Sequence, residues 1–271
     1  MTLRSPVITV MTAAARKAAR GLVRDFGEVE NLQVSRKGPA DFVSAADLRA
    51  EQVLRRELTR ARPRFGLLME ESGETAGVDS SHRFIVDPLD GTLNFLHGIP
   101  HFAISIALEE NKELVAGVIY DPIRDETFAA EKGQGAYLNR YRLRVSSRAR
   151  LADAVVGTGI PRRALEANPG YLAAVARAMG ACAALRRSGS AALDLAYVAA
   201  GRYEGFWEPG LAPWDIAAGA LLVREAGGFI TTIDGGDGFL ASGDVLAAND
   251  KLHQPLMALL AGRGAGDRRT A

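Results

Sequence analysis

The chain has 271 residues, of which 48% are hydrophobic and 24% are charged, and its formal net charge is +1. This is the composition of a globular protein with room for roughly two domains or one large core. A nearly neutral chain has no overall electrostatic reason to bind nucleic acid or an anionic membrane. No apolar run is long enough to cross a bilayer. Composition therefore argues against a membrane protein and against any partner selected by net charge.

Cysteine and histidine limit the kind of metal ion that the chain could bind. Cys182 is the single cysteine, so no intrachain disulfide or thiolate cluster can form, which suits a reducing compartment. None of the four histidines has a metal-ligand spacing such as H-E-x-x-H: His82, His97, His101 and His253. A bound metal ion would need carboxylate and carbonyl ligands, and such ligands favour a hard cation.

The first half of the chain predicts two helices followed by strands. Apolar residues one turn apart predict a helix over 7–26, and the acidic residues after it favour a structural helix in a cytoplasmic protein over a transit peptide. Gly38-Pro39 predicts an irregular segment before a second helix over 47–60. The predicted strands cover 65–69, 82–87, a meander over 104–121 that turns at Asn111-Lys112, and a hairpin over 127–145.

Beyond residue 146 strands and helices alternate, which predicts an α/β arrangement. Strands are predicted over 154–159, 203–208, 229–233 and 245–250, and helices over 171–180, 190–201, 215–228 and the C-terminus. The change of pattern predicts an N-terminal α+β lobe, 1–145, and a C-terminal α/β lobe, 146–271. The tail 262–271 has nothing to bury and is expected to be disordered.

Acidic residues follow the predicted strands at the places where α/β proteins build their sites. They are Glu70 and Glu71 in LLMEES, Asp87 and Asp90 in FIVDPLDGTLN, and Asp215 in PWDIAAG. Each has an ordinary explanation: solvated glutamates on a loop, an Asp-Pro turn with an Asx cap, and a helix N-cap worth about 1 kcal/mol. Their occurrence together favours a metal site, predicted in the N-terminal lobe and completed by the C-terminal one.

The segment 87–94 suits a metal ion and a phosphate together. Asp87 ends an apolar strand, Pro88 stiffens the turn, and Asp90 follows three residues later, so both carboxylates can converge. Gly91 lacks the Cβ that would block a ligand, and Thr92 begins a segment with free N–H groups for a phosphate. Carboxylates beside a phosphate repel it unless a cation intervenes, and Mg²⁺ bridges the two kinds of oxygen.

Two long segments, DPLDGTLNFLHGIPHFAISIAL (87–108) and WDIAAGALLVREAGG (214–228), resemble the signatures of the inositol monophosphatase family, among the lithium-sensitive, fructose-1,6-bisphosphatase-like phosphatases. RRSGSAALDLAYVAAGRYEGFWE (186–208) and DFVSAAD (41–47) are similar to its bacterial SuhB-like branch. The resemblance covers nearly the whole chain. It implies an αβαβα sandwich, a homodimer, and hydrolysis of small phosphate esters by metal-activated water.

Matched positions imply roles for individual residues. Two or three Mg²⁺ ions are expected per site, and the implied metal ligands are Glu70, Asp87, the Leu89 carbonyl, Asp90 and Asp215. Glu70 and Thr92 would orient and deprotonate the attacking water, with Asp47 polarising the Thr92 hydroxyl. The positions that match substrate contacts are Leu89, Asp90, Gly91, Thr92, Arg186, Gly189, Ser190, Ala191, Glu208 and Asp215.

Four positions depart from the family pattern without removing a metal ligand. Met69 replaces the usual Gly before the paired glutamates, Ser44 replaces Thr, and Leu93 replaces a frequent second Thr. Ala212 stands where bacterial members often carry Lys or Arg, which leaves substrate choice open.

The function that the resemblance implies is Mg²⁺-dependent, Li⁺-inhibited hydrolysis of myo-inositol 1-phosphate or a similar polyol phosphate. Relatives with the same core use fructose-1,6-bisphosphate, histidinol phosphate, NADP⁺ or 3′-phosphoadenosine phosphates, so these stay as alternatives. The SuhB-like resemblance also implies a partner of the transcription machinery during ribosomal RNA synthesis. Only the basic stretches 140–150 and 184–189 could serve that role, and a solvated hairpin edge plus an active-site arginine explains them better.

Overall fold

The computed structural model describes residues 5–26, 34–38, 41–160 and 170–262, with only the backbone of 34–38 and 41–44. The helices are α1 (Pro6–Phe26), α2 (Ala45–Ala61), α3 (Thr92–Leu96), α5 (Tyr171–Ala181), α6 (Ala191–Ala199), α7 (Pro213–Glu225), α8 (Phe239–Ser242) and α9 (His253–Leu260), with a 3₁₀ turn at Leu151–Asp153. The strands are β1 (Val34–Gly38), β2 (Asp41–Ser44), β3 (Phe65–Met69), β4 (Gly73–Thr75), β5 (Asp79–Asp90), β6 (Ala103–Glu110), β7 (Glu113–Asp121), β8 (Glu126–Glu131), β9 (Gly135–Leu138), β10 (Tyr141–Arg142), β11 (Val155–Thr158), β12 (Ala184–Arg186), β13 (Gly205–Glu208), β14 (Phe229–Thr231) and β15 (Val245–Ala248).

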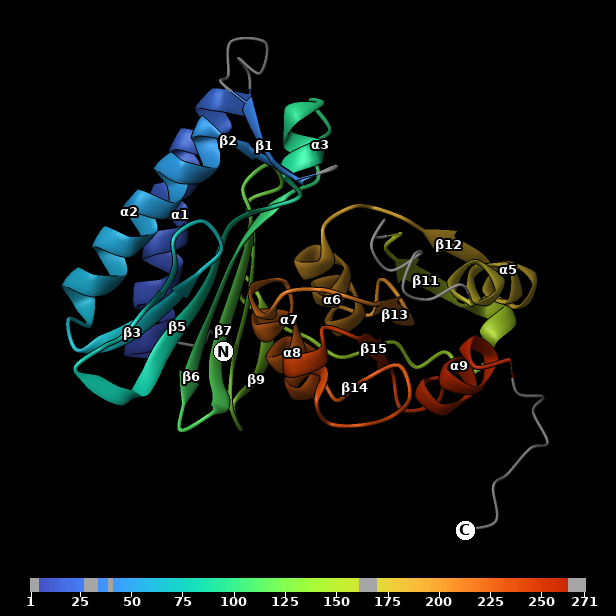
Figure 1. Ribbon diagram of the computed structural model, residues 1–271. Coiled ribbons are helices and arrows are strands. Elements are labelled where there is room, and N and C mark those ends of the chain that lie inside the picture. The colour runs from blue at the N-terminus through green and yellow to red at the C-terminus, as the bar shows by residue number, and fades with distance from the viewer. Residues whose placement is uncertain (1–4, 27–33, 39–40, 161–169, 263–271) are drawn as a thin grey trace.

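These elements stack in alternating layers of helices and sheets (Figure 1). Helices α1 and α2 cover the outer face of an eight-stranded sheet with the order β10-β9-β8-β7-β6-β5-β3-β4. Helices α6 and α7 lie between this sheet and a five-stranded sheet with the order β12-β11-β13-β15-β14. Helices α5 and α9 cover the far face of the smaller sheet. The expected αβαβα sandwich is confirmed.

Strand periodicity explains how each sheet serves two layers. In β6, Ile104 and Ile106 belong to the core under α1 and α2, whereas Ala103 and Ala107 belong to the core around α6 and α7. In β13, Phe206 and Trp207 likewise enter opposite cores. Successive side chains on a strand point to opposite faces, so a strand buried on both faces is apolar at successive positions. The sequences of these strands are therefore apolar at successive positions and show little alternation of apolar and polar residues.

The central helices approach the large sheet closely because small residues line the contact. A Cβ on Gly117 of β7 would lie 3.0 Å from the Ala218 carbonyl oxygen of α7. A Cβ on Gly219 would lie 2.5 Å from the Leu195 Cβ of α6. Glycine at position 117 therefore lets α7 approach the large sheet, and glycine at position 219 lets α7 approach α6.

The predicted helices and most predicted strands are confirmed, with boundaries shifted by a few residues. The strand over 65–69 is reproduced as β3, and the meander turns at Asn111 and Lys112, whose φ angles are 51° and 66°. The stretch expected to be irregular around Gly38 contains the antiparallel pair β1–β2 instead. The lobe boundary at 145/146 falls between β10 and β11 and stays a prediction. Of the tail 262–271, only Gly262 lies within the described residues.

No helix in the described part of the chain has both the length and the apolar composition needed to span a membrane.

Two helical glycines give a matched test of this packing. Gly219→Ala should lower the free energy of unfolding by about 1–3 kcal/mol, because the added methyl group overlaps Leu195. Gly21→Ala in α1, where a Cβ would meet nothing within 4 Å, should raise it by about 0.5–1 kcal/mol. Denaturant unfolding measures both variants. A Gly219→Ala protein as stable as Gly21→Ala would contradict the close α6–α7 contact.

Candidate active site

The predicted acidic residues converge although they come from three different elements. Glu70 follows β3, Asp87 and Asp90 end β5, and Asp215 lies in the first turn of α7. One carboxylate oxygen from each of the three aspartates lies within 4.8 Å of the others. Asp87 is 2% exposed. The Glu70 carboxyl contacts Asp87 by a side-chain hydrogen bond. Residues 145 positions apart in the sequence thus form one partly buried acidic cluster, a group that could hold a metal ion.

Backbone and hydroxyl donors hold each aspartate in place. Asp87 Oδ1 accepts the Leu89 N–H at 2.8 Å, which is the Asx turn considered for this sequence. Asp215 Oδ2 accepts the Ala212 N–H at 2.8 Å, so Asp215 is the third helical residue and not the N-cap. The Asx turn at Asp87 and the helix start at Asp215 are therefore both present, and each of them orients a carboxylate of the acidic cluster.

Asp90 is bound by the N-terminus of α6. Its Oδ2 accepts the Ser190 hydroxyl at 2.6 Å and the Ala192 N–H at 2.8 Å. The N-terminal end of a helix carries partial positive charge, which stabilises an ionised carboxylate. This contact joins residues 100 positions apart and brings the predicted substrate positions Ser190 and Ala191 to the acidic cluster.

Burial raises the pKa of all three aspartates, and repulsion between carboxylates adds to the shift of Asp87 and Asp215. Burial, followed by repulsion from Glu70, Asp90 and Asp215, raises the pKa of Asp87 well above its usual range. Burial raises the pKa of Asp90 to about 6, against the hydrogen bonds from Ser190 and α6. Burial and the charge of Asp90 raise the pKa of Asp215 to about 7. The cluster offers only oxygen ligands and unbalanced negative charge, which fits a hard divalent cation.

Thr92 and Asp47 meet beside the cluster. The Thr92 hydroxyl lies 2.9 Å from Asp47 Oδ1 and 3.1 Å from the Leu89 carbonyl oxygen, so it donates its single proton to one of these oxygens. Asp47 is fully buried in the first turn of α2. Thr92 and Asp47 therefore lie as the family resemblance implied, with the carboxylate of Asp47 beside the Thr92 hydroxyl.

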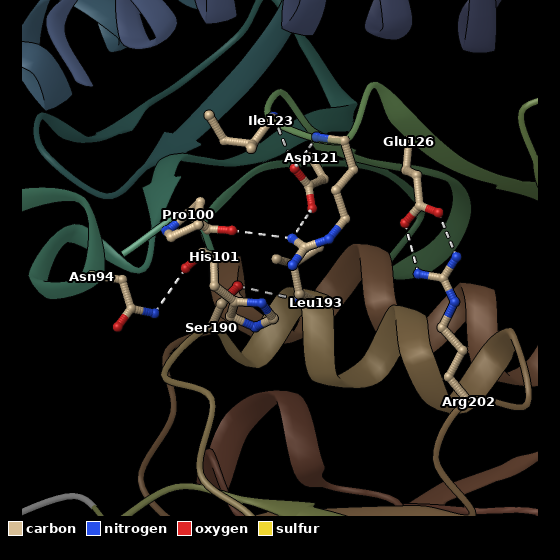
Figure 2. Close-up of polar contacts among 10 residues, drawn as sticks. Asn94, Pro100, His101, Asp121, Ile123, Glu126, Ser190, Leu193 and Arg202 are labelled. Atoms are coloured by element: carbon tan, nitrogen blue, oxygen red, sulfur yellow. Dashed lines mark hydrogen bonds and ion pairs between the residues drawn. The ribbon is translucent and has the colours of Figure 1, made fainter. Parts of the chain in front are cut away.

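Gly91 and Gly189 allow the two predicted substrate segments to touch. Gly91, the N-cap of α3, has a φ of 99°, and a Cβ there would lie 3.0 Å from the His101 carbonyl oxygen and 3.3 Å from that of Gly189. Gly189 has a φ of 84°. The Asn94 amide donates to the carbonyl oxygens of His101 and Ser188, each at 2.8 Å. Figure 2 shows the bond to His101. Asn94 was not among the candidates, although a buried asparagine in DGTLN is a signal for such a bridge.

The loop after α3 is anchored from the other side. The Arg124 guanidinium donates to the Pro100 carbonyl oxygen at 3.1 Å and to Asp121 Oδ2 at 2.8 Å. Figure 2 labels the two acceptor residues, Pro100 and Asp121. Asp121 is fully buried. This ion pair fixes the chain between α3 and β6, and with it the backbone that Asn94 contacts.

Glu208 and Arg186 occupy different surroundings. Burial, and then the charge of Asp90, raise the pKa of Glu208 to about 8, and a Cβ on Gly159 would overlap its carboxyl. Arg186 is exposed and donates to the Leu185 carbonyl oxygen at 2.9 Å. The arginine that acts electrostatically on Glu208 is its neighbour Arg187, which sequence reasoning missed. Glu208 thus lies within electrostatic reach of Asp90, whereas the described hydrogen bond of Arg186 is to the neighbouring residue Leu185.

The fold is an αβαβα sandwich with an acidic site at the end of β5 and the start of α7. The model of the inositol monophosphatase family matches residues 3–263, and the chain belongs to this family.

Individual relatives agree with this assignment. The chain is 56% identical over 254 residues to the inositol-1-monophosphatase of Mesorhizobium japonicum, covering 94% of this chain and 96% of the relative. It is 43% identical over 253 residues to Nus factor SuhB of Escherichia coli K12, covering 93% and 95%. The crystal structure of the extragenic suppressor protein suhB from Bartonella henselae superposes with a TM-score of 0.92 at 56% identity, covering 97% of this chain and all of that one.

Removing one charge from the cluster should stabilise the metal-free protein. A carboxyl whose folded-state pKa is raised adds stability that is complete below its unfolded pKa near 4 and is lost as pH rises through 6 to 7. In EDTA, the wild-type melting temperature should therefore fall between pH 5 and pH 8. Asp215→Asn keeps the acceptor for Ala212 and should melt higher than wild type at pH 8.

Mg²⁺ should reverse this order, raising the melting temperature of wild type at pH 8 but much less that of Asp215→Asn. Asp153→Asn, an exposed aspartate remote from the cluster, should behave as wild type in both conditions. Equal Mg²⁺ shifts in wild type and Asp215→Asn would count against a metal site at this cluster.

Proposed function

We propose that the protein is a Mg²⁺-dependent phosphomonoesterase that hydrolyses myo-inositol 1-phosphate or a similar small polyol or sugar phosphate. The observation that carries the proposal is the convergence of Asp87, which is buried, with the partly buried Asp90 and Asp215 beside the N–H groups at the start of α3. Relatives at 52–56% identity bear the name inositol-1-monophosphatase. We also expect a cytoplasmic homodimer, as the resemblance implied.

The metal ligands in this proposal are Glu70, Asp87, the Leu89 carbonyl, Asp90 and Asp215, for two or three ions. All of them offer oxygen, the atom that Mg²⁺ prefers. The bound cations would neutralise the phosphate and promote ionisation of the attacking water. The elevated pKa values of Asp90 and Asp215 support this, because none of the main interactions that set them is with a cationic side chain.

Thr92, Asp47 and Glu70 handle the attacking water. With its proton donated toward Asp47, the Thr92 oxygen keeps a lone pair free to accept a hydrogen bond from water. Glu70, next to Asp87, is the carboxylate that takes the proton. Asp47 thus holds the hydroxyl in its accepting orientation, and Glu70 acts as general base.

The phosphate and the polyol would bind on opposite sides of Asp90. The N–H groups of Gly91 and Thr92 lie at the start of α3, where the helix end favours an anion. On the α6 side, Gly189, Ser190, Ala191 and Glu208 would contact the polyol hydroxyls. Arg186 stays a predicted substrate contact, although its described hydrogen bond is to Leu185.

The first test is phosphate release from myo-inositol 1-phosphate by the purified protein, with Mg²⁺ titrated in the presence and absence of Li⁺. Turnover should require Mg²⁺ and fall with Li⁺. Fructose-1,6-bisphosphate, histidinol phosphate, NADP⁺ and a 3′-phosphoadenosine phosphate belong in the same panel, and a preferred substrate among them would redirect the proposal. Absence of release from every substrate at every Mg²⁺ concentration would overturn it.

A single carboxylate tests the assigned base. Glu70→Gln should reduce kcat by about 100-fold or more, in line with the usual contribution of a general base. Glu74→Gln is the matched control, because Glu74 lies on the adjoining strand β4 and pairs with Arg83 at the surface. Full Mg²⁺-dependent turnover by Glu70→Gln would contradict the role.

Relatives named Nus factor SuhB favour a second candidate, the transcription partner implied by the SuhB-like resemblance. In the basic stretch 140–150, Arg148 pairs with Glu204 and Arg150 with Asp153, whereas Arg140 and Arg144 are exposed with no ion pair to another described residue. Co-purification of RNA polymerase or antitermination factors with the tagged protein would support this candidate, and their absence would remove it.

A further inference from the structure

Asp194 is a buried carboxyl next to the candidate site that none of the assigned roles uses. It lies in the first turn of α6 and is 1% exposed. Its Oδ1 is buried and has no hydrogen-bond partner among the described residues. Asp90, Glu208 and Arg187 act on it electrostatically. Such a group is costly to bury, so it needs a reason beyond packing.

The Asp194 carboxyl supports the turn that carries the predicted substrate contacts. It accepts a side-chain hydrogen bond from Ser188, whose hydroxyl lies 3.1 Å from the Tyr203 hydroxyl. Ser188 begins the turn that leads through Gly189 to Ser190 and the α6 N-terminus. Asp194 and Tyr203 therefore hold the side chain of the first residue of this turn.

The opposite side of the same turn is held by the first half of the chain. Asn94 donates to the Ser188 carbonyl oxygen, and Asp90 accepts the Ser190 hydroxyl. A Cβ on Gly91 would lie 3.3 Å from the Gly189 carbonyl oxygen. Two sets of contacts therefore hold the turn. Asp90 and Asn94 hold it from one side, and Asp194 holds it from the α6 side.

We propose that Asp194 is a positioning residue for the reaction, whose buried carboxyl anchors the Ser188 hydroxyl and thereby sets where the Ser188–Ser190 turn stands against Asp90 and the substrate. It touches neither substrate nor metal ion. Losing the anchor would let the turn move away from Asp90, which weakens substrate binding more than it slows the chemical step.

The surroundings of the Asp194 carboxyl disfavour its charged form. Burial, followed by the charges of Glu208 and Asp90, raises its pKa well above the usual range, with Ser188 and Arg187 opposing. The asparagine amide has the shape of a carboxyl group and keeps an oxygen that accepts a hydrogen bond. Asparagine should therefore replace it, whereas leucine has the same branching but cannot accept the Ser188 proton.

The experiment compares Asp194→Asn with Asp194→Leu by steady-state kinetics on the polyol phosphate that wild type turns over, so it rests on the proposed function. Asp194→Leu should raise KM by about tenfold, the net worth of one hydrogen bond, and change kcat by less than about threefold. Asp194→Asn should keep KM within about twofold of wild type. The melting temperature of Asp194→Leu should equal or exceed that of wild type, because a costly buried polar group is removed.

Glu204→Ala is the matched control. Glu204 is also 1% exposed but lies beyond the other end of β13 from Glu208, bound to Arg148 and the Val155 N–H. It should lower the melting temperature and leave KM unchanged. A wild-type KM in Asp194→Leu, or equal loss in Asp194→Asn and Asp194→Leu, would overturn the positioning role.

A calorimetric titration separates this outcome from failure of the proposed function. myo-Inositol titrated in the presence of Mg²⁺ needs no turnover and probes the polyol side that this turn contacts, and Asp194→Leu should bind it several-fold more weakly than wild type and Asp194→Asn. If wild type hydrolyses no substrate, the proposed function fails, and this titration alone decides the role of Asp194. Equal myo-inositol affinity in all three proteins would reject that role.

Discussion

The structure depends on the repulsion among the carboxylates at the end of β5 and the start of α7. Two unit charges about 5 Å apart repel by about 3 kcal/mol at an effective dielectric constant near 20. Asp87, Asp90 and Asp215 make three such pairs, and burial penalises each charge further. Hydrogen bonds to charged groups return only about 1.5–3 kcal/mol each. Without a cation, protonation of part of the cluster relieves the remaining energy, as the raised pKa values show.

The rest of the molecule can be understood as the support for this unfavourable cluster. The helices around it begin at the cluster: α3 at Gly91, α6 at Ser190 and α7 at Ala212. Their N-terminal N–H groups point toward the acids or toward the space where a phosphate would bind. The central helices are almost wholly apolar, and their packing on both sheets supplies the stability that the cluster removes. An acidic centre of this kind is tolerated because the layers around it are well packed.

The sequence predicted the acids and the layers but not the contacts that join them. Apolar periodicity was sufficient for α1, α2 and the meander, because each of these elements is long enough to show its period. The three-residue strands β4 and β12 carry no readable period, and β1 and β2 flank a Gly-Pro that reads as a break. The motif 87–94 revealed the cluster because its spacing alone brings Asp87 and Asp90 together.

Contacts between distant segments could not be found this way. Asn94 bridging to Ser188, Gly159 leaving space for Glu208, and the acid Asp194 depend on segments that only the folded chain brings together. Arg186 and Arg187 illustrate the same limit. They are neighbours at the end of a short strand, where adjacent side chains point to opposite sides, and a motif match cannot decide which of them faces the acids.

Asp90 is where the two halves of the chain become one site. It ends a strand of the large sheet, yet its side chain is bound by the helix that packs beneath the small one. Any charge brought to Asp90 therefore acts on the position of α6 as well as on β5. A cation that neutralises the cluster should accordingly tighten the contact between β5 and α6, while the metal-free protein keeps the same contacts under repulsion. Binding of the cation and ordering of the substrate turn at Ser188–Ser190 are, on this geometry, two consequences of the same hydrogen bonds.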